Sequence, residues 1–339
     1  TWSFPRSMQP LIASIGFRYG RAHMEEVGVN EFAREWTIPV ATGLRFEVTT
    51  AYESAIFEQF FTGYDRAFIL PSEKEDTEGF RDCLALNHGP EHRRLASQFG
   101  PFVELCIAIR DVESGAFIGG ANLLAVLFAG PDGRPVVTSN LNYVYVETAA
   151  RGKGYLKRII AGIFELVSGL FPQARGAAPL IFIEQNDPLR MDPEAYRADT
   201  EHAGIDQFDR LLVWAKAGAW LVDFPYIQPG LSEDQGPDET LVYAILSPPG
   251  PKLDPAILAR HLERFFAISV LKGRDGRGEE IIASQERELS RRAARHEVIH
   301  LIDPKPLLVE LAGKSDRWSH WRERPRSLIE AARAYQPAG

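Results

Sequence analysis

Residues 140–164 read NLNYVYVETAARGKGYLKRIIAGIF, and this stretch decides the fold class. Its first seven residues alternate in the manner of a half-buried strand, and the residues after Gly154 carry apolar side chains at helical spacing. Between the two segments lies a turn that contains Gly152 and Gly154. Glycine lets backbone amides approach a ligand without a Cβ in the way, and the N-terminus of a helix attracts anions. The stretch therefore predicts a strand, a phosphate-binding turn and a helix.

The turn matches neither of the two familiar phosphate-binding loops. It contains no GxGxxG, and no Gly-Lys-Ser or Gly-Lys-Thr ending that would coordinate magnesium. A connection without any ligand is the alternative, because glycine is also the usual residue of tight turns. The order of the surrounding elements is what favours a ligand.

Composition excludes several classes of protein. The chain has 339 residues, of which 45% are hydrophobic, and this suffices for one large domain or two. A net charge of -8 argues against a general nucleic-acid binder, which needs a basic surface. No apolar run of about 18 residues predicts a membrane span, and residues 1–6 do not resemble a signal peptide, so we expect a cytoplasmic protein. Cys83 and Cys106 lie in apolar patterns, so we expect reduced core thiols.

The order of predicted elements divides the chain into three parts. A strand at 44–49 is followed by two helices, and three strands then lead to the turn, at 103–110, 116–128 and 136–146. After the turn we expect a helix at 152–169, a strand at 180–184, a helix within 207–217, and strands at 220–224 and 241–246. The Pro-rich segment 248–251 ends this domain, 44–247, and a helical extension occupies 252–339. Residues 1–43 have no assigned role, with a short helix expected at 21–36.

This order, with the Gly-rich turn after the fourth strand, resembles the GNAT superfamily of acyl-CoA-dependent N-acyltransferases. The turn is similar to the pyrophosphate loop of that family, which reads Gln or Arg, two residues, Gly, one residue, then Gly or Ala. Arg151, Gly154 and Leu156 occupy those positions, and Leu156 departs from the pattern. The resemblance implies an α+β fold with a mixed, mostly antiparallel central sheet flanked by helices. It also implies acetyl-CoA or another acyl-CoA as co-substrate.

The resemblance further implies which residues hold the acyl-CoA. The pyrophosphate would contact Arg151 and the amides of the turn, namely Gly152, Lys153, Gly154, Tyr155 and Leu156. Main-chain groups of Val144 and Val146 would pair with the pantetheine arm, as a peptide adds to a strand edge. Asn186 falls at the end of the fifth strand, where family members carry an Asn that contacts cofactor or acceptor. An Asx turn before Asp187 is the alternative for Asn186.

The general acid is the first of two catalytic roles to assign. Trp214 stands where the family usually has the tyrosine that protonates the leaving thiolate, and an indole N–H cannot deliver a proton at neutral pH. Tyr143, Tyr145 and Tyr226 are the candidates to replace it, and we select Tyr145. Either such a residue serves or the thiolate is released to solvent. For each tyrosine, an aromatic packed in the core or at the rim is the alternative.

A general base is also needed, to deprotonate an ammonium acceptor. The resemblance implies a carboxylate on the fourth or fifth strand, where family members often carry this base. The fourth strand offers Asn140 and Asn142 but no carboxylate before Glu147, so the resemblance points to Glu184 on the fifth strand. A solvated or ion-paired Glu184 is the alternative.

Other charged groups leave two interpretations open. Four acids precede or begin the second helix, and they either attract a cationic amine or complement the helix dipole: Glu73, Glu75, Asp76 and Glu78. His88 and His92 have i,i+4 spacing but no third ligand in view, and the sequence has no HExxH, so we expect no catalytic metal.

The sequence therefore predicts transfer of an acetyl or short acyl group from acyl-CoA to an amine by direct attack on the thioester. The acceptor would be a small-molecule or peptide amine, and the acidic body of the chain favours a cationic one. Neither nucleic acid nor membrane is an expected partner. A non-catalytic CoA-binding, sensor or interaction module is the alternative, and the C-terminal helices could form a homodimer.

Overall fold

One mixed sheet organises the computed structural model, which describes residues 32–70, 74–231, 235–274, 280–314 and 326–335. Its strand order within these residues is β1-β2-β3-β4-β5-β6-β8-β7-β10-β9. All neighbouring strands are antiparallel except the pair β5 and β6. The strands are β1 Glu35–Val40, β2 Leu44–Thr49, β3 Phe102–Asp111, β4 Phe117–Ala129, β5 Pro135–Val146, β6 Leu180–Asn186, β7 Ala219–Val222, β8 Leu241–Leu246, β9 Lys252–Leu253 and β10 Ile299–Ile302. The expected mixed, mostly antiparallel sheet is confirmed.

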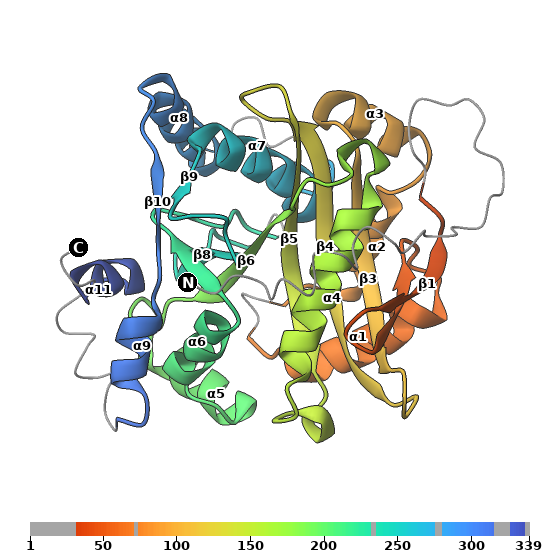
Figure 1. Ribbon diagram of the computed structural model, residues 1–339, viewed down its shortest axis with the longest axis horizontal. Coiled ribbons are helices and arrows are strands. Elements are labelled where there is room, and N and C mark those ends of the chain that lie inside the picture. Colours follow the sequence, from red (N-terminus) through yellow and green to blue (C-terminus); the bar gives the residue numbers. More distant parts are fainter. Residues whose placement is uncertain (1–31, 71–73, 232–234, 275–279, 315–325, 336–339) are drawn as a thin grey trace. The chain divides into compact units, whose positions relative to one another are not determined.

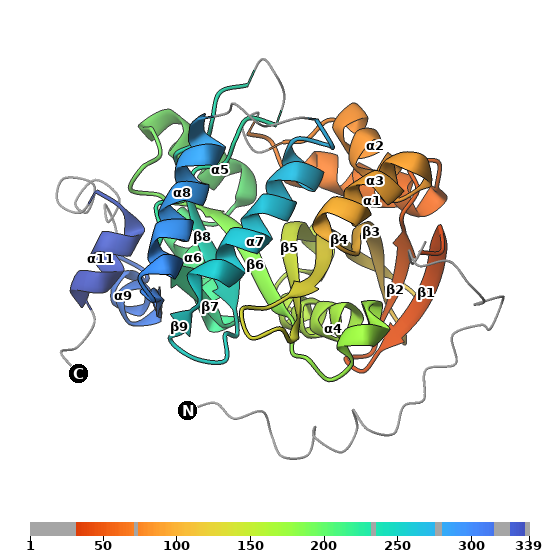
Figure 2. The same ribbon diagram turned by 90° about the horizontal axis from the view of Figure 1, so that it is seen from above.

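Helices cover both faces of this sheet (Figures 1 and 2). The main helices are α1 Ala55–Ala67, α2 Thr77–Ala85, α3 Gly89–Phe99, α4 Tyr155–Leu170, α5 Pro193–Ala203, α6 Gln207–Lys216, α7 Pro255–Phe265, α8 Glu280–Ala294, α9 Lys305–Leu311 and α11 Leu328–Tyr335. Apolar residues of α4, α6, α9 and α11 belong to one core cluster with one face of the sheet. Residues of α3, α7 and α8 form a second cluster with the other face, and α1 and α2 add a third. Two layers of helices therefore enclose the sheet.

Side-chain caps fix where the first two helices begin. The Ser54 hydroxyl accepts the Ile56 N–H at 3.1 Å and so begins α1, and the Thr50 hydroxyl donates to Ala33 O. Asp76 accepts the Gly79 N–H at 2.8 Å and begins α2. For Asp76, the helix-terminus interpretation is therefore correct.

The sheet extends across both expected domain boundaries. Strand β1 pairs with β2 along its whole length, although Glu35 and Trp36 were expected in a helix; the rest of that expected helix up to residue 31 lies outside the described residues. The segment 252–339 contains the expected helices, and it also supplies β9 and β10 to the sheet. Helices α3 and α5 were not expected either. His88 precedes α3 as its N-cap residue, and His92 Nδ1 lies 3.0 Å from Leu86 O, so the two histidines do not form a metal pair.

Candidate active site

The central feature is a gap between β5 and β6. These strands pair in parallel only from Thr138 to Asn140, opposite Leu180 to Phe182, and then diverge (Figure 1). Glu147 N–H donates to Ile118 O of the β4 side at 2.8 Å. Since alternate residues of a strand direct their amide groups to opposite sides, the main-chain groups of Val144 and Val146 face the gap. No strand pairs with this edge beyond Asn140, although the Val146 carbonyl accepts a hydrogen bond from Arg151.

A cavity of about 540 Å³ occupies this gap and reaches both faces of the sheet. On the side of α4 and α6, its lining includes Leu156, Gln185 and Trp214. On the side of α2 and α7, its lining includes Glu104 and Ser269. The cavity thus connects two chemically different surfaces through the sheet.

The Gly-rich turn lies at the first of these surfaces. Gly152 and Gly154 have φ values of +74° and +77°, which glycine adopts without strain. A Cβ at either position would meet no atom within 4 Å, so the turn leaves open space beside its backbone. Because α4 begins at Tyr155, the amides of its first turn have no acceptor within the helix. The turn has the geometry of an anion site.

Side chains of the turn support the loop itself. Arg151 Nε donates to Val146 O at 3.2 Å, and its Nη1 donates to Ala203 O at 3.2 Å. Lys153 Nζ donates to Ala149 O at 2.8 Å, and Tyr155 donates to Asp111 at 3.3 Å. These residues therefore fix the shape of the turn and of the strand end beside it.

Asn186 ends β6 and lines the cavity, as its predicted role requires. It pairs with Leu241 of β8. The turn-forming hydrogen bond of this segment belongs to the next residue, because Asp187 Oδ1 accepts the Leu189 N–H at 3.0 Å. The Asx turn thus forms at Asp187, and Asn186 keeps its place at the cavity.

Glu184, the predicted base, also lines the cavity. Its Oε1 accepts hydrogen bonds from the Tyr226 hydroxyl and from Gln228 Nε2, the latter at 2.9 Å. Desolvation raises the pKa of this carboxyl to about 7 although the hydrogen bond from Tyr226 opposes it. Glu184 is therefore half-buried and hydrogen-bonded, and it can exchange a proton near neutral pH.

Tyr145, the predicted acid, packs beneath α1. It is 6% exposed, and its hydroxyl donates to Phe60 O at 2.7 Å. A Cβ on Gly63 or Gly120 would lie within 2.8 Å of the Tyr145 hydroxyl, which shows how closely the two elements approach this side chain. Burial raises the pKa of Tyr145 well above its usual range. Its only proton is thus engaged with a helix carbonyl.

A second carboxylate, Glu104, was missed by the sequence analysis. It is 1% exposed, it lines the cavity from β3, and desolvation raises its pKa to about 7. The available signal was a single acid inside the apolar run FVELCIAI of residues 102–109. A charged side chain in such a run is rarely buried without partners, and strongly perturbed carboxyls in clefts indicate functional sites.

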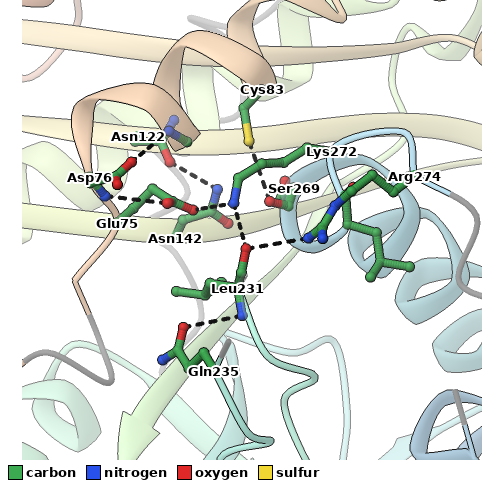
Figure 3. A network of polar contacts seen from close by, with 12 residues as sticks. Glu75, Asp76, Cys83, Asn122, Asn142, Leu231, Gln235, Ser269, Lys272 and Arg274 are labelled. Atoms are coloured by element: carbon green, nitrogen blue, oxygen red, sulfur yellow. Dashed lines mark hydrogen bonds and ion pairs between the residues drawn. The ribbon is translucent and has the colours of Figure 1, made fainter. Parts of the chain in front are cut away.

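An ion pair closes the same end of the cavity. Lys272 Nζ lies 2.8 Å from Glu75 Oε2, and both side chains are nearly buried, at 8% and 12% exposure. Figure 3 shows Lys272 also reaching Leu231, whose carbonyl accepts a hydrogen bond at 2.8 Å. One acid of the cluster before α2 therefore holds the C-terminal segment in place and is not open to solvent.

Neither a cluster of metal-binding side chains nor a helix able to span a membrane occurs in the described part of the chain. No group of three or more His, Cys, Asp or Glu side chains there could hold a metal ion. None of its helices is long and apolar enough to cross a bilayer.

Comparison with known proteins gives a weak structural likeness and no match in sequence. No protein-family model matches the sequence, and no curated protein matches it. Among solved structures, a chain from the crystal structure of the NatC complex bound to Gag peptide and CoA is similar over 60% of this chain and 97% of that chain. The identity is 12% and the TM-score is 0.29. The assignment of the cavity therefore rests on its own residues.

Proposed function

We propose that this protein transfers an acetyl or other short acyl group from acyl-CoA to an amine. One observation carries the proposal: a single cavity extends from Arg151 and Leu156, which flank the Gly-rich turn on one face of the sheet, to the carboxyls of Glu104 and Glu184 on the other face. A donor and an acceptor entering from opposite faces would meet in the gap between β5 and β6.

The turn side of the cavity fits an acyl-CoA. The pyrophosphate would contact the amides of Gly152 to Leu156, beside which the structure leaves open space. Gln185 supports the fit, since its side-chain oxygen is buried and has no hydrogen-bond partner among the described residues. A pantetheine arm carries amide N–H groups that would satisfy this acceptor, and unsatisfied buried acceptors are costly without a ligand.

When bound, acyl-CoA supplies an activated thioester carbonyl. The open edge at Val144 and Val146 would hold the arm as an added strand, and the Val146 N–H, which faces the gap, would polarise the carbonyl. Apolar walls such as Leu141 and Leu156 exclude water from this position. Positioning of donor and amine would supply most of the rate enhancement.

Proton transfer depends on the other side of the cavity. Either Glu184 or Glu104 would take the proton of an ammonium acceptor. Because Trp214 cannot act as an acid and Tyr145 is bonded to Phe60, the thiolate would leave without a side-chain acid. We expect the acceptor to be a cationic small-molecule or peptide amine, since carboxylates line the site that receives it.

The test is a thiol-release assay with acetyl-CoA and a panel of alkylamines, polyamines, amino acids and peptides, preceded by calorimetry with acetyl-CoA. We expect binding at micromolar to millimolar concentration and release of thiol with at least one amine. Absence of binding at millimolar acetyl-CoA would contradict the proposal.

A second candidate function is a non-catalytic CoA-binding sensor or interaction module. Two observations favour it: the Tyr145 hydroxyl already donates to Phe60 O, and position 214 is a tryptophan. In that case, calorimetry would detect CoA and no amine of the panel would release thiol.

A further inference from the structure

Glu104 is held entirely by neutral hydrogen-bond donors. Its Oε1 accepts from Asn122 Nδ2 at 2.8 Å and from Asn142 Nδ2 at 2.9 Å, and its Oε2 accepts from the Ser269 hydroxyl at 2.7 Å. No Lys or Arg of the described residues forms an ion pair with this carboxylate, and the adjacent Lys272 pairs with Glu75. A carboxylate in such a site can exist in either protonation state near neutral pH.

A directed chain of hydrogen bonds ends at this carboxylate. Asn142 Oδ1 accepts from Asn140 Nδ2 at 2.9 Å, and Asn140 Oδ1 accepts from the Tyr243 hydroxyl at 2.5 Å. Tyr243 has one proton, so the 2.7 Å contact with His261 requires the histidine to donate through Nε2. Its Nδ1 then accepts from Thr138 Oγ1 at 2.8 Å. The donors from Thr138 to Asn142 point towards Glu104, and Asn140 also acts on Glu184 through a side-chain hydrogen bond.

The histidine in this chain stays neutral, as the chain requires. Burial lowers the pKa of His261 to about 3, so one ring nitrogen donates and the other accepts at physiological pH. Donors that point the same way polarise one another in a buried site. The chain therefore stabilises negative charge on Glu104 without placing a cation beside it.

Two departures from regular backbone supply the donors of Glu104. Asn142 occupies a β-bulge, since Asn122 pairs with Tyr143 while Leu123 pairs with Leu141. Ser269 lies in a π-helical segment, Phe266–Val270. Bulges and π-helical turns are over-represented at functional sites because they re-aim side chains. No comparable irregularity of the described residues supplies a donor to Glu184.

The titratable surroundings of Glu104 are few. Glu75 acts on it from the segment before α2, while Cys83 of α2 and Cys106 of its own strand lie close enough to be affected by its charge. Burial raises the pKa of both thiols well above their usual range, so they remain neutral. Glu104 is thus the group beside Ser269 that can change its charge near pH 7.

We propose that Glu104 takes the proton of an alkylammonium acceptor, and that Ser269, Asn122 and Asn142 position its carboxylate. This inference rests on the proposed acyl transfer. Aromatic side chains at the same end of the cavity, Phe80 and Phe265, suit the alkyl stem of a primary amine.

The proposed step moves two protons from the amine nitrogen. Glu104 receives one proton from R–NH₃⁺, and the nitrogen lone pair forms the C–N bond at the thioester carbonyl. The C–S bond breaks and its electron pair leaves on sulfur, which receives the second nitrogen proton to give the thiol. When Glu104 is protonated, the Ser269 hydroxyl can reverse and accept its hydrogen bond, because a hydroxyl both donates and accepts.

Kinetic variants test the assignment. With the most active amine of the panel, we expect kcat/KM of the wild type to rise tenfold per pH unit and to level off near pH 7. Glu104→Gln should lower kcat by about 100-fold or more and remove this rise, while the Kd for CoA changes less than twofold. Ser269→Ala should move the levelling point to higher pH, because the carboxylate loses a donor.

Two variants serve as matched controls: exposed Glu113→Gln and exposed Ser284→Ala should leave the profile unchanged. Glu184→Gln should lower activity but keep the rise. The assignment of Glu104 as proton acceptor would be overturned if kcat/KM of Glu184→Gln no longer rose with pH. It would also be overturned if kcat/KM of Glu104→Gln still rose.

A readout independent of turnover covers a Glu104→Gln variant that fails to fold and separates the two proposals. Carbon-13 NMR of glutamate-labelled protein should show two carboxyls that titrate near pH 7, of which only one, that of Glu104, moves to a higher pKa in Ser269→Ala. Titration of every carboxyl near pH 4.5, with normal turnover, would overturn only the role of Glu104. A neutral titration with CoA binding but no amine turnover would contradict the acyl-transfer proposal and the proton-acceptor role with it.

Discussion

The two faces of the gap between β5 and β6 differ in how they treat polar groups. On the α4 side, the main-chain edge at Val144 and Val146 is open and the Gln185 oxygen is unsatisfied. On the α2 and α7 side, both carboxylate oxygens of Glu104 accept hydrogen bonds, and Glu184 Oε1 accepts from Tyr226 and Gln228. Under the proposed function, the first face would suit a ligand that brings its own donors. The second is complete without a ligand and is arranged to control charge.

This contrast indicates which partner enters from which face. An acyl-CoA arm would contribute amides, and the Gln185 oxygen on the turn side is an acceptor without a partner among the described residues. An ammonium group contributes charge and needs carboxylates whose proton affinity is already set. The predictions below therefore perturb one face at a time.

Breaking the ion pair that closes the carboxylate side should have the largest effect. Lys272→Met leaves Glu75 buried without its cation, and we expect the free energy of unfolding to fall by about 3–5 kcal/mol. Lys314→Met is the matched control, because its pair with Glu310 is half-exposed on both sides and should contribute about 0–1 kcal/mol. Urea unfolding of both variants measures the difference. Equal losses would show that the Lys272 pair is not buried in solution.

The pH dependence of stability tests the same face. The pKa of Glu104 is about 7 in the folded protein and lies near 4.3 when unfolded, so the folded state binds the proton more tightly. Stability should therefore fall as pH rises from about 4.5 to about 7, with Glu104 contributing roughly 3 kcal/mol. In Glu104→Gln the part of this decrease in the free energy of unfolding that Glu104 causes should vanish, while the part that Glu184 causes remains. Urea unfolding of the wild type and of Glu104→Gln at pH 5 and pH 8 measures this difference. An equal decrease in stability in the two proteins would contradict a buried Glu104 with a raised pKa.

The turn face should respond to added side chains through binding. Gly154→Ala forces a Cβ into a left-handed conformation, at a cost of about 1–2 kcal/mol, and distorts the amides that would hold the pyrophosphate. We expect the Kd for CoA to rise about tenfold by calorimetry. Gly176→Ala is the control, since Gly176 also has a positive φ, +90°, and open surroundings but lies away from the turn. Similar losses of CoA affinity in Gly154→Ala and Gly176→Ala would contradict the proposal that the turn binds the pyrophosphate.

Gln185 should give the smallest and most diagnostic change. Gln185→Met removes a buried acceptor that lacks a partner, so the free protein should be unchanged or slightly more stable. If the CoA arm donates to this oxygen, affinity should nevertheless fall about five- to tenfold, as for one lost hydrogen bond of about 1 kcal/mol. Tighter binding of CoA by Gln185→Met would show that the pantetheine arm does not donate to the Gln185 oxygen.

Much of the sheet was predictable because its patterns are local. Strand β2 has the expected bounds, 44–49, and α4 begins only three residues later than expected because Gly154 forms its N-cap. Strand β10 was missed since its four residues, IHLI, are too short for a pattern to emerge. Its place in the sheet depends on pairing with β7, which is distant in sequence.

The site was less predictable because its contacts are long-range. The turn and Glu184 could be proposed from the sequence alone, but the environment of Glu104 depends on partners at positions 122, 142 and 269. The hydrogen-bond partner of Tyr145 could not be predicted from the sequence either. Its strand was predicted correctly, yet only the packing of α1 shows that its hydroxyl bonds to Phe60.

The most direct test of the account measures amide hydrogen exchange with and without acetyl-CoA. The proposed arrangement predicts that exchange at Val144 and Val146, on the open edge of β5, slows when acetyl-CoA binds, together with the amides of Gly152 and Gly154. Binding that leaves the Val144 and Val146 amides unprotected, or no binding at millimolar acetyl-CoA, would contradict the claim that the gap between β5 and β6 is an acyl-CoA site.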